Sequence, residues 1–252
     1  MALTQGIERY ERQILFGPLG EAGQAGLCGK IVLVAGVGAL GTNVAGMLVR
    51  AGVSVRLVDH DTVELSNLQR QSLYDETDVA EGRPKVHAAA EKLQVCNSQV
   101  SIEPIVARID PDNAAELVAG TDLIIDGVDN FAAKFALNRA ACDADIPFIY
   151  GAVSGSYGLT KVIRPGRDAC LCCLYCSEPD RDSSETAATA GVIAPVVNVI
   201  ASLQVAAALK ILAGCDRDTV EDLVQVDVWD VEMCRIPVAR RANCPACGGL
   251  IG

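Results

Sequence analysis

The sequence predicts an α/β fold whose centre is a doubly wound, mostly parallel sheet. From residue 30 to residue 153, short apolar runs of strand length alternate with stretches of helical periodicity. A glycine-rich turn follows the first run, and polar residues follow the ends of several others. Parallel strands need a crossover that is usually a helix, so this alternation favours a parallel sheet. After residue 153 the alternation stops, which predicts an antiparallel C-terminal extension.

The predicted elements follow from local signals in chain order. The expected strands are 31–35, 53–58, 100–106, 123–126, 147–153, 158–164, 223–228 and 231–236, and the expected helices are 7–16, 20–27, 40–51, 86–95, 113–118, 131–142 and 196–212. Gly17-Pro18, Gly29 and Gly52 end the first three helices. Pro84 suits the start of the fourth, and Asp110-Pro111-Asp112 caps the fifth.

The last predicted helix is nearly all apolar, which predicts burial all round, in the core or in a subunit contact. Polar residues nevertheless interrupt 196–212, so no uninterrupted apolar run reaches the ~20 residues that a membrane span needs. Segment 1–10 carries an acid and lacks the apolar core of a signal peptide. We therefore expect a cytoplasmic protein that makes no membrane contact.

Composition narrows the class of protein. Half of the 252 residues are apolar, which is ample for the core of one large domain. The net charge of −11 argues against nucleic acid as the main partner, because such proteins usually present a basic face. Without a secretory signal, the 11 cysteines are better interpreted as metal ligands, nucleophiles or core residues than as disulfides.

The glycine-rich turn predicts a nucleotide site. Gly36, Gly38 and Gly41 would let the turn bend, let the backbone approach a phosphate and let the helix pack closely on the strand. The helix that follows offers free N–H groups to an anion. Asp59 ends the next strand, 18 residues after Gly41, where a Rossmann-like fold carries its ribose-binding acid. The motif alone does not say which nucleotide binds.

Further polar residues follow strand ends. Segment 61–71 is too polar for a strand and too long for a tight turn, so it predicts a ligand-binding loop. Lys85 falls in the first turn of a helix, which is unfavourable to the helix dipole unless an anion lies between them. Asp129 and Asn130 follow another buried strand. The alternatives are a solvent-facing Lys85 and acids that only form turns.

Two cysteine pairs predict a structural zinc site. Cys170-x-x-Cys173 and Cys244-x-x-Cys247 have the spacing of zinc knuckles, and four thiolates leave no open position for catalysis. The metal would pin the C-terminal tail to the body of the fold. Cys173-x-x-Cys176 is an equally well spaced first pair, and a redox dithiol is the alternative use of either pair.

These assignments describe a single domain over residues 1–252. Its parts are N-terminal helices at 1–28, a nucleotide-binding, Rossmann-like part at 30–153, and a zinc-pinned C-terminal part at 154–252 with a mobile loop at 177–190.

Seven motifs in chain order carry a family resemblance. They are Arg9-Tyr10-Glu11-Arg12-Gln13, Gly36 to Gly41, Asp59 to Arg70, Gly82-Arg83-Pro84-Lys85, Gly127-Val128-Asp129-Asn130, Ala190 to Pro195 and the two cysteine pairs. Together they resemble the ubiquitin-activating-enzyme-like adenylyltransferases, in the MoeB, ThiF and HesA branch. The match covers nearly the whole chain, and the run Ser66-Asn67-Leu68-Gln69-Arg70 is far more specific than the glycine motif.

The resemblance implies an activity and its partners. Such enzymes adenylate the C-terminal glycine of a small ubiquitin-like carrier protein, usually ending in Gly-Gly, using ATP and Mg2+ and releasing pyrophosphate. A homodimer is implied, in which Arg12 reaches the partner subunit's ATP site. The implied catalytic residues are Arg12, Arg70, Lys85 and Asp129, and the implied nucleotide-binding residues are Gly36, Gly38, Ala39, Gly41, Asp59, Asp61, Asn67, Gln69, Arg70, Lys85, Asp129 and Asn130.

Roles follow from the side-chain chemistry. Carboxylate and ATP are both anions, so the site must neutralise charge and align them. The planar fork of Arg70 would hold β- and γ-phosphate oxygens, whereas Lys85 would act as a point charge. Asp129 would position Mg2+. We interpret Asp126 as a structural acid at a strand end, with a direct role as the alternative. His60 and His87, the only histidines, have no partner motif and are taken as structural.

One feature departs from many relatives, which carry a cysteine in the mobile region. The expected position here holds Ala187, and no cysteine lies between Cys176 and Cys215. We therefore expect the reaction to stop at the acyl-adenylate, with sulfur supplied by a separate donor. Cys176 is the alternative nucleophile if it is not a zinc ligand.

Three other functions compete with carrier adenylation. A peptide C-terminus could be the acceptor, as in natural-product pathways, and the missing cysteine suits that too. A nicotinamide-dependent oxidoreductase would explain Asp59 but not Lys85 or the run 66–70. A scaffold without turnover would not need Arg70 or Asp129. The sequence does not name the carrier or the pathway that receives the sulfur.

Overall fold

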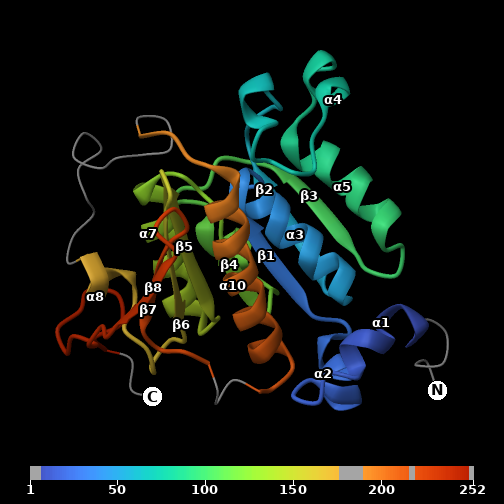
Figure 1. The fold of residues 1–252 in the computed structure, drawn as a ribbon. Coiled ribbons are helices and arrows are strands. Elements are labelled where there is room, and N and C mark those ends of the chain that lie inside the picture. The colour runs from blue at the N-terminus through green and yellow to red at the C-terminus, as the bar shows by residue number, and fades with distance from the viewer. Residues whose placement is uncertain (1–6, 176–189, 216–218, 250–252) are drawn as a thin grey trace.

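The computed structural model describes residues 7–175, 190–215 and 219–249 (Figure 1). Its helices are α1 (Ile7–Ile14), α2 (Gly20–Leu27), α3 (Ala39–Ala51), the 3-10 helix η1 (Leu65–Asn67), α4 (Glu76–Ala80), α5 (Lys85–Cys96), α6 (Ala114–Val118), α7 (Phe131–Ala144), α8 (Leu171–Tyr175) and α10 (Ala194–Leu212). Its strands are β1 (Ile31–Ala35), β2 (Ser54–Asp59), β3 (Ile102–Val106), β4 (Leu123–Asp126), β5 (Phe148–Ser154), β6 (Tyr157–Ile163), β7 (Leu223–Asp227) and β8 (Glu232–Ile236).

The strands form one mixed sheet in the order β3-β2-β1-β4-β5-β6-β7-β8 within the described ranges. β1 to β5 pair in parallel, and β6, β7 and β8 are added antiparallel. The predicted fold class is therefore confirmed. Because β2 and β4 flank β1 on opposite sides, the chain reverses its winding direction between β1 and β4. In such sheets ligands bind at the carboxyl ends of the strands, at this switch point.

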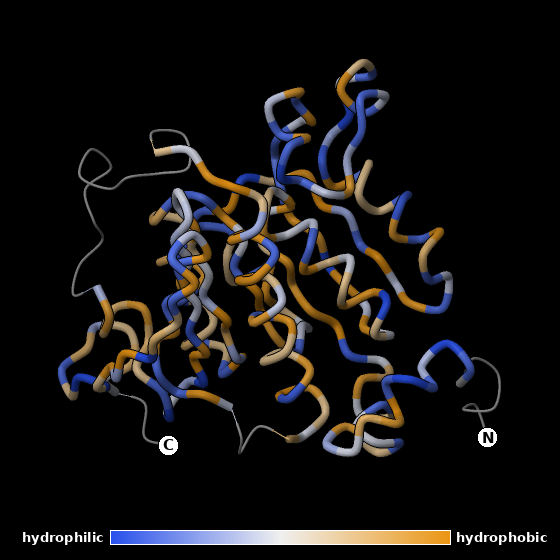
Figure 2. Tube along the Cα trace, in the orientation of Figure 1, coloured by the Kyte–Doolittle hydropathy of each residue, from blue (hydrophilic) through white to orange (hydrophobic). Residues whose placement is uncertain are grey.

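Helices cover both faces of the sheet, and residue alternation assigns each side chain to a face. Val32 and Val34 of β1 point into a core shared with α3, α5 and α10. Leu33 and Ala35 point into the other core, against α6 and α7. The central strands are accordingly apolar along most of their length (Figure 2). A strand buried on both faces needs this continuous apolar run, and that is why β1 was recognisable from the sequence.

The structure departs from the sequence predictions at α10 and at two short helices. α10 is not buried all round in the chain, because Asn198, Ser202, Ala206 and Lys210 form an exposed stripe along it. Burial of that stripe in a subunit contact remains a prediction. α4 and α8 were not expected, since five residues are too few to show helical periodicity. By length and composition α10 alone, within the described ranges, could cross a membrane, but here it packs on the sheet and on α3.

Candidate active site and metal centre

The turn between β1 and α3 requires glycine for steric reasons. Gly36 has φ +81°, and a Cβ added there would lie 2.7 Å from the Gly127 carbonyl oxygen. A Cβ on Gly41 would lie 1.9 Å from the Gly36 carbonyl oxygen. Gly38 is the N-cap of α3 and supplies no side-chain cap, and Ala39 begins the helix. The N-terminus of a 13-residue helix is therefore open to an anion, at the switch point of the sheet.

Asp59 holds this turn in place. Its Oδ2 accepts a 2.7 Å hydrogen bond from the Val37 N–H, and its Oδ1 accepts one of 2.9 Å from the Asp61 N–H. The residue is 9% exposed, so the turn encloses most of it. Each oxygen has a further lone pair, which fits an acid that also accepts hydrogen bonds from ribose hydroxyls.

Lys85 lies beside this acid and is buried, not solvent-facing. It is the first residue of α5, and its Nζ lies 2.8 Å from Asp61 Oδ2. Burial alone would raise the pKa of Asp61, but the hydrogen bond and the charge of Lys85 lower it overall. The Tyr74 hydroxyl donates to the Val37 carbonyl at 2.7 Å and lies 3.2 Å from the Lys85 carbonyl. Tyr74 thus joins the glycine turn to the start of α5.

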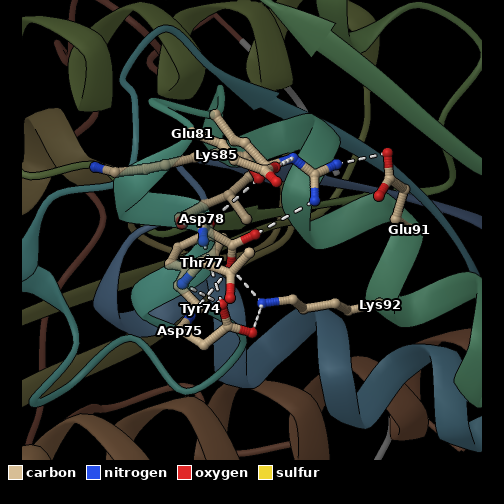
Figure 3. A network of polar contacts seen from close by, with 10 residues as sticks. Tyr74, Asp75, Thr77, Asp78, Glu81, Lys85, Glu91 and Lys92 are labelled. Carbon is tan, nitrogen blue, oxygen red and sulfur yellow. Dashed lines mark hydrogen bonds and ion pairs between the residues drawn. The ribbon is translucent and has the colours of Figure 1, made fainter.

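Ion pairs fix the segment that leads to Lys85 (Figure 3). Lys92 of α5 bridges Asp75 and Asp78, which form the capping box of α4. Arg83 pairs with Asp78 at 3.4 Å and with Glu91 at 2.5 Å. Sequence reasoning did not find this network, because its members lie on three separate segments. It holds α4 and the 81–84 turn against α5.

The predicted phosphate-contacting loop surrounds η1. The Asn67 side chain is buried and accepts a 3.2 Å hydrogen bond from the Glu64 N–H, which forms part of the capping box of this short helix. Gln69 donates to the Val192 carbonyl at 3.4 Å, near the start of α10. Arg70 is half-buried and donates to the Ser66 carbonyl at 2.8 Å through one of its five N–H groups. The other donors of its guanidinium suit a bidentate contact with phosphate.

The β4–α7 turn presents an exposed Asp129. Asn130 is the N-cap of α7, and its Oδ1 accepts a 2.9 Å hydrogen bond from the Ala133 N–H. Asp126 points into the protein and pairs with Lys134 at 2.8 Å. Complete burial raises the pKa of Asp126, and the charge of Lys134 acts in the opposite direction. Asp126 therefore occupies the structural position expected of it.

Four cysteines meet in the core that lies on the opposite face of the sheet from α10. The Sγ atoms of Cys170 and Cys244 lie 3.5 Å apart, as do those of Cys173 and Cys247, and all four lie within 4.8 Å of one another. Tetrahedral zinc with Zn–S bonds of 2.3 Å would set its sulfurs about 3.8 Å apart, so the arrangement fits this metal. Cys172 stays outside the group and accepts a 3.7 Å hydrogen bond from Asn138 Nδ2.

Helix α7 connects this centre to the β4–α7 turn. The Asn138 side chain accepts a 2.9 Å hydrogen bond from the Leu171 N–H at the first knuckle. At the start of α7, the ring of Phe131 packs edge-on against Tyr175, with centroids 5.1 Å apart. The Tyr175 hydroxyl lies 2.7 Å from that of Tyr150. The first cysteine knuckle and the Asp129 turn thus both adjoin α7.

Comparison with known proteins identifies the family. The sequence model of the ThiF family matches residues 10–246. The chain belongs to the ThiF family. The sulfur carrier protein ThiS adenylyltransferase of Bacillus subtilis is 44% identical over 243 residues, which cover 95% of this chain and 71% of that protein. The molybdopterin-synthase adenylyltransferase of Escherichia coli is 36% identical over 242 residues, which cover 95% and 96%.

Solved structures agree on the fold. E. coli MccB with ATP superposes with a TM-score of 0.84 and 23% sequence identity, over 96% of this chain and 75% of that one. At this identity the likeness shows the fold alone. The ThiF-family relatives named above are adenylyltransferases, which confirms the predicted enzyme class and gives the oxidoreductase alternative no support.

In this chain, Arg12 lies far from the glycine turn between β1 and α3. Tyr10 of α1 packs against Gly52, the C-cap of α3, and Gln13 donates to the Ala51 carbonyl. α3 is about 20 Å long, and the turn is at its other end (Figure 1). Arg12 is exposed there. The other predicted nucleotide-binding residues lie in the segments that follow the carboxyl ends of β1, β2 and β4, with Lys85 paired to Asp61. Cys176 and Ala187 lie outside the described residues.

Proposed function

We propose that this chain adenylates the C-terminal glycine of a small ubiquitin-like sulfur-carrier protein ending in Gly-Gly. The observation that carries the proposal is the convergence of an open α3 N-terminus, Asp59 and the buried Lys85–Asp61 pair at one sheet edge, in a chain of the ThiF family. Relatives at 44% and 36% identity are named for ThiS and for molybdopterin synthase. A cytoplasmic location is part of the proposal.

The chemistry is a displacement at the α-phosphate of ATP. A carboxylate oxygen of the carrier attacks the α-phosphorus, the bond to the bridging oxygen of the β-phosphate breaks, and pyrophosphate leaves with its electron pair. Both reactants are anions, so cationic side chains must offset their repulsion. Arg70 would bind the β- and γ-phosphates, Lys85 would contribute a point charge, and Asn67 and Gln69 would orient the chain of phosphates.

Asp129 would hold Mg2+, because it is an exposed carboxylate at the strand-end turn. When bound, Mg2+ neutralises phosphate charge and favours pyrophosphate departure. Asp59 would bind the ribose hydroxyls, and the N–H groups at Gly38 and Ala39 would face the phosphates. Zinc on the four cysteines would be structural, since four protein ligands leave no open position.

Arg12 would act from a second subunit. Its place beside the C-terminal end of α3 is too far from its own glycine turn for a direct contact. A homodimer that presents α1 to the partner's nucleotide site would supply the missing positive charge. The exposed stripe of α10 would suit such a contact, because small and polar side chains allow close packing.

The product would be the free acyl-adenylate. No cysteine lies between Cys176 and Cys215, so residues 177–193 supply no thiol for a thioester. A separate sulfur donor would convert the adenylate into a thiocarboxylate.

The test is ATP–pyrophosphate exchange by the purified protein with a panel of small Gly-Gly proteins, each paired with a version lacking its last two glycines. We expect exchange with one intact carrier and none with its truncated form. Arg70→Ala should abolish exchange, whereas Arg50→Ala, an exposed arginine at the far end of α3, should not. If none of the carriers supports exchange, the proposal is refuted. If a short peptide supports exchange instead, the acceptor is a peptide and not a carrier protein. A conjugate that dithiothreitol releases would refute the adenylate-only reaction.

A further inference from the structure

A buried ion pair beneath the β4–α7 turn has no role in the function proposed above. Lys134, in the first turns of α7, and Asp126, the last residue of β4, approach to 2.8 Å. Their side chains are only 5% and 0% exposed. Buried ion pairs contribute little net stability relative to apolar residues, because both charges must lose their hydration. Stability alone is therefore a weak reason for placing one here.

The ammonium group of Lys134 has a full set of acceptors. Besides Asp126 Oδ2, it donates to the carbonyl oxygens of Val128 and Gly151, each at 2.7 Å. It also lies 5.2 Å from the ring centroid of Tyr150. A lysine has three N–H donors, and all three are used. The group is consequently held in one position between β4, β5 and α7.

Asp126 and Lys134 together hold the backbone of Val128. Its Oδ1 accepts a 3.1 Å hydrogen bond from the Val128 N–H, and its Oδ2 accepts one of 3.3 Å from the Gly151 N–H. Both backbone groups of Val128 are thus bonded to the ion pair, the N–H to Asp126 and the carbonyl to Lys134. The Val128 carbonyl belongs to the peptide group that leads into Asp129. Fixing this peptide plane fixes the N–Cα bond of Asp129, and so restricts the directions in which the Asp129 side chain can leave the backbone.

A third side chain braces the pair from the opposite face of the sheet. Gln204 of α10 donates a 2.9 Å hydrogen bond to the Asp126 carbonyl and is fully buried. A Cβ on Gly151 would come within 2.3 Å of Gln204 Nε2, so the space around the pair is filled. The turn therefore rests on a rigid polar support.

We propose that Lys134 and Asp126 are a positioning pair that aims the Asp129 carboxylate at the Mg2+ of the bound nucleotide. The inference rests on the proposed function for the bound nucleotide and for Asp129 as the residue that holds Mg2+. Neither residue touches substrate. Losing the pair should weaken the contribution of Mg2+ to binding and catalysis more than it weakens binding of the nucleotide itself.

The test uses the double variant Lys134→Met/Asp126→Asn of the full chain, which removes the pair without leaving a buried charge unpartnered. The matched control is Lys161→Met, which removes another buried lysine, on β6, whose Nζ contacts the Glu221 carbonyl. ATP binding is measured calorimetrically at several Mg2+ concentrations, and exchange gives kcat and KM.

We expect the double variant to bind metal-free ATP within about threefold of wild type, but to need about tenfold more Mg2+ and to lose about 10- to 100-fold in kcat, as for a catalytic group displaced by about 1 Å. Lys161→Met should match wild type in both. Lys134→Arg keeps the charge and several donors, so it should recover part of the Mg2+ dependence.

Two results would overturn the proposal. One is a folded double variant with the Mg2+ dependence of wild type. The other is an equal loss of binding with and without Mg2+, which would mean that the pair supports the whole site and not the Asp129 turn. If the double variant does not fold, the single variant Lys134→Met decides, since a folded form with the Mg2+ dependence of wild type would also refute the inference. If wild type shows no exchange with any carrier, the proposed function fails, while the calorimetric Mg2+ measurement still decides the role of Lys134.

Discussion

The Tyr74 hydroxyl joins two parts of the proposed nucleotide site, so Tyr74→Phe removes one oxygen and tests that link directly. Tyr74 is 7% exposed, and its hydroxyl donates to the Val37 carbonyl at 2.7 Å and lies 3.2 Å from the Lys85 carbonyl. The Phe ring fills the same space, so no large cavity forms. What is lost is one buried hydrogen bond, and a carbonyl is left without its donor.

The magnitude follows from these contacts. A neutral hydrogen bond contributes about 1 kcal/mol net, and an unsatisfied buried carbonyl adds about 1 kcal/mol or more. We expect Tyr74→Phe to lower the free energy of unfolding by about 2 kcal/mol, which is a fall in Tm of about 4–8 °C for a chain of this size. Burial, with a smaller contribution from Asp59, raises the pKa of Tyr74 far above its ordinary value. The hydroxyl therefore stays protonated, and the effect should be the same at pH 6 and pH 9.

The assay combines thermal unfolding with the KM for ATP in pyrophosphate exchange. Because the glycine turn and the start of α5 lose their link, KM should rise several-fold, with a smaller change in kcat. Tyr157→Phe is the control, since Tyr157 is 52% exposed on β6 and its loss should change Tm by less than about 2 °C. A Tyr74→Phe protein with the Tm and KM of wild type would refute the structural reasoning.

Three further variants test the steric, electrostatic and metal arguments. Gly41→Ala should destabilise the chain and abolish ATP binding in calorimetry, because its Cβ would lie 1.9 Å from the Gly36 carbonyl oxygen; an alanine variant that binds ATP normally would contradict this. Asp61 has a lowered pKa in the folded state, so its contribution to stability is present above its ordinary pKa of 3.8 and is lost as the pH falls below it. The urea midpoint of Asp61→Asn should therefore vary less between pH 6 and pH 3 than that of wild type, and parallel curves would refute the ion pair. Cys173→Ser should lose the single zinc expected per chain in elemental analysis and should have a lower Tm than wild type. Cys172→Ser should keep the zinc content and the Tm of wild type. The reverse pattern would exclude the assigned ligands.

Much of the fold was predictable because its signals are local. A strand buried on both faces, such as β1, is a continuous apolar run, and a turn that excludes every Cβ must be made of glycine, as at Gly36 and Gly41. The cysteine pairs were recognisable by spacing, because a tetrahedral metal accepts two ligands from one tight turn. Element ends differed from expectation by only a few residues, since caps and glycines mark them.

Contacts between distant segments were not predictable in the same way. The sequence indicated that Lys85 begins a helix but not that Asp61 would pair with it, and it gave no sign that Tyr74 would bridge Val37 and Lys85. Lys134 was missed altogether, because a lysine on a helix is normally a surface residue. Only the packing of β4, β5 and α7 makes it a buried partner of Asp126.

The sequence by itself thus determined the order of the elements, the nucleotide turn and the cysteine pairs, because each depends on residues adjacent along the chain. The tertiary structure decided which charges pair, which face of α10 is exposed, and that Arg12 is remote from its own glycine turn. These properties depend on the distances between elements. Those distances are set only when the sheet and its two helical layers pack, and a linear pattern of residues carries no direct information about them.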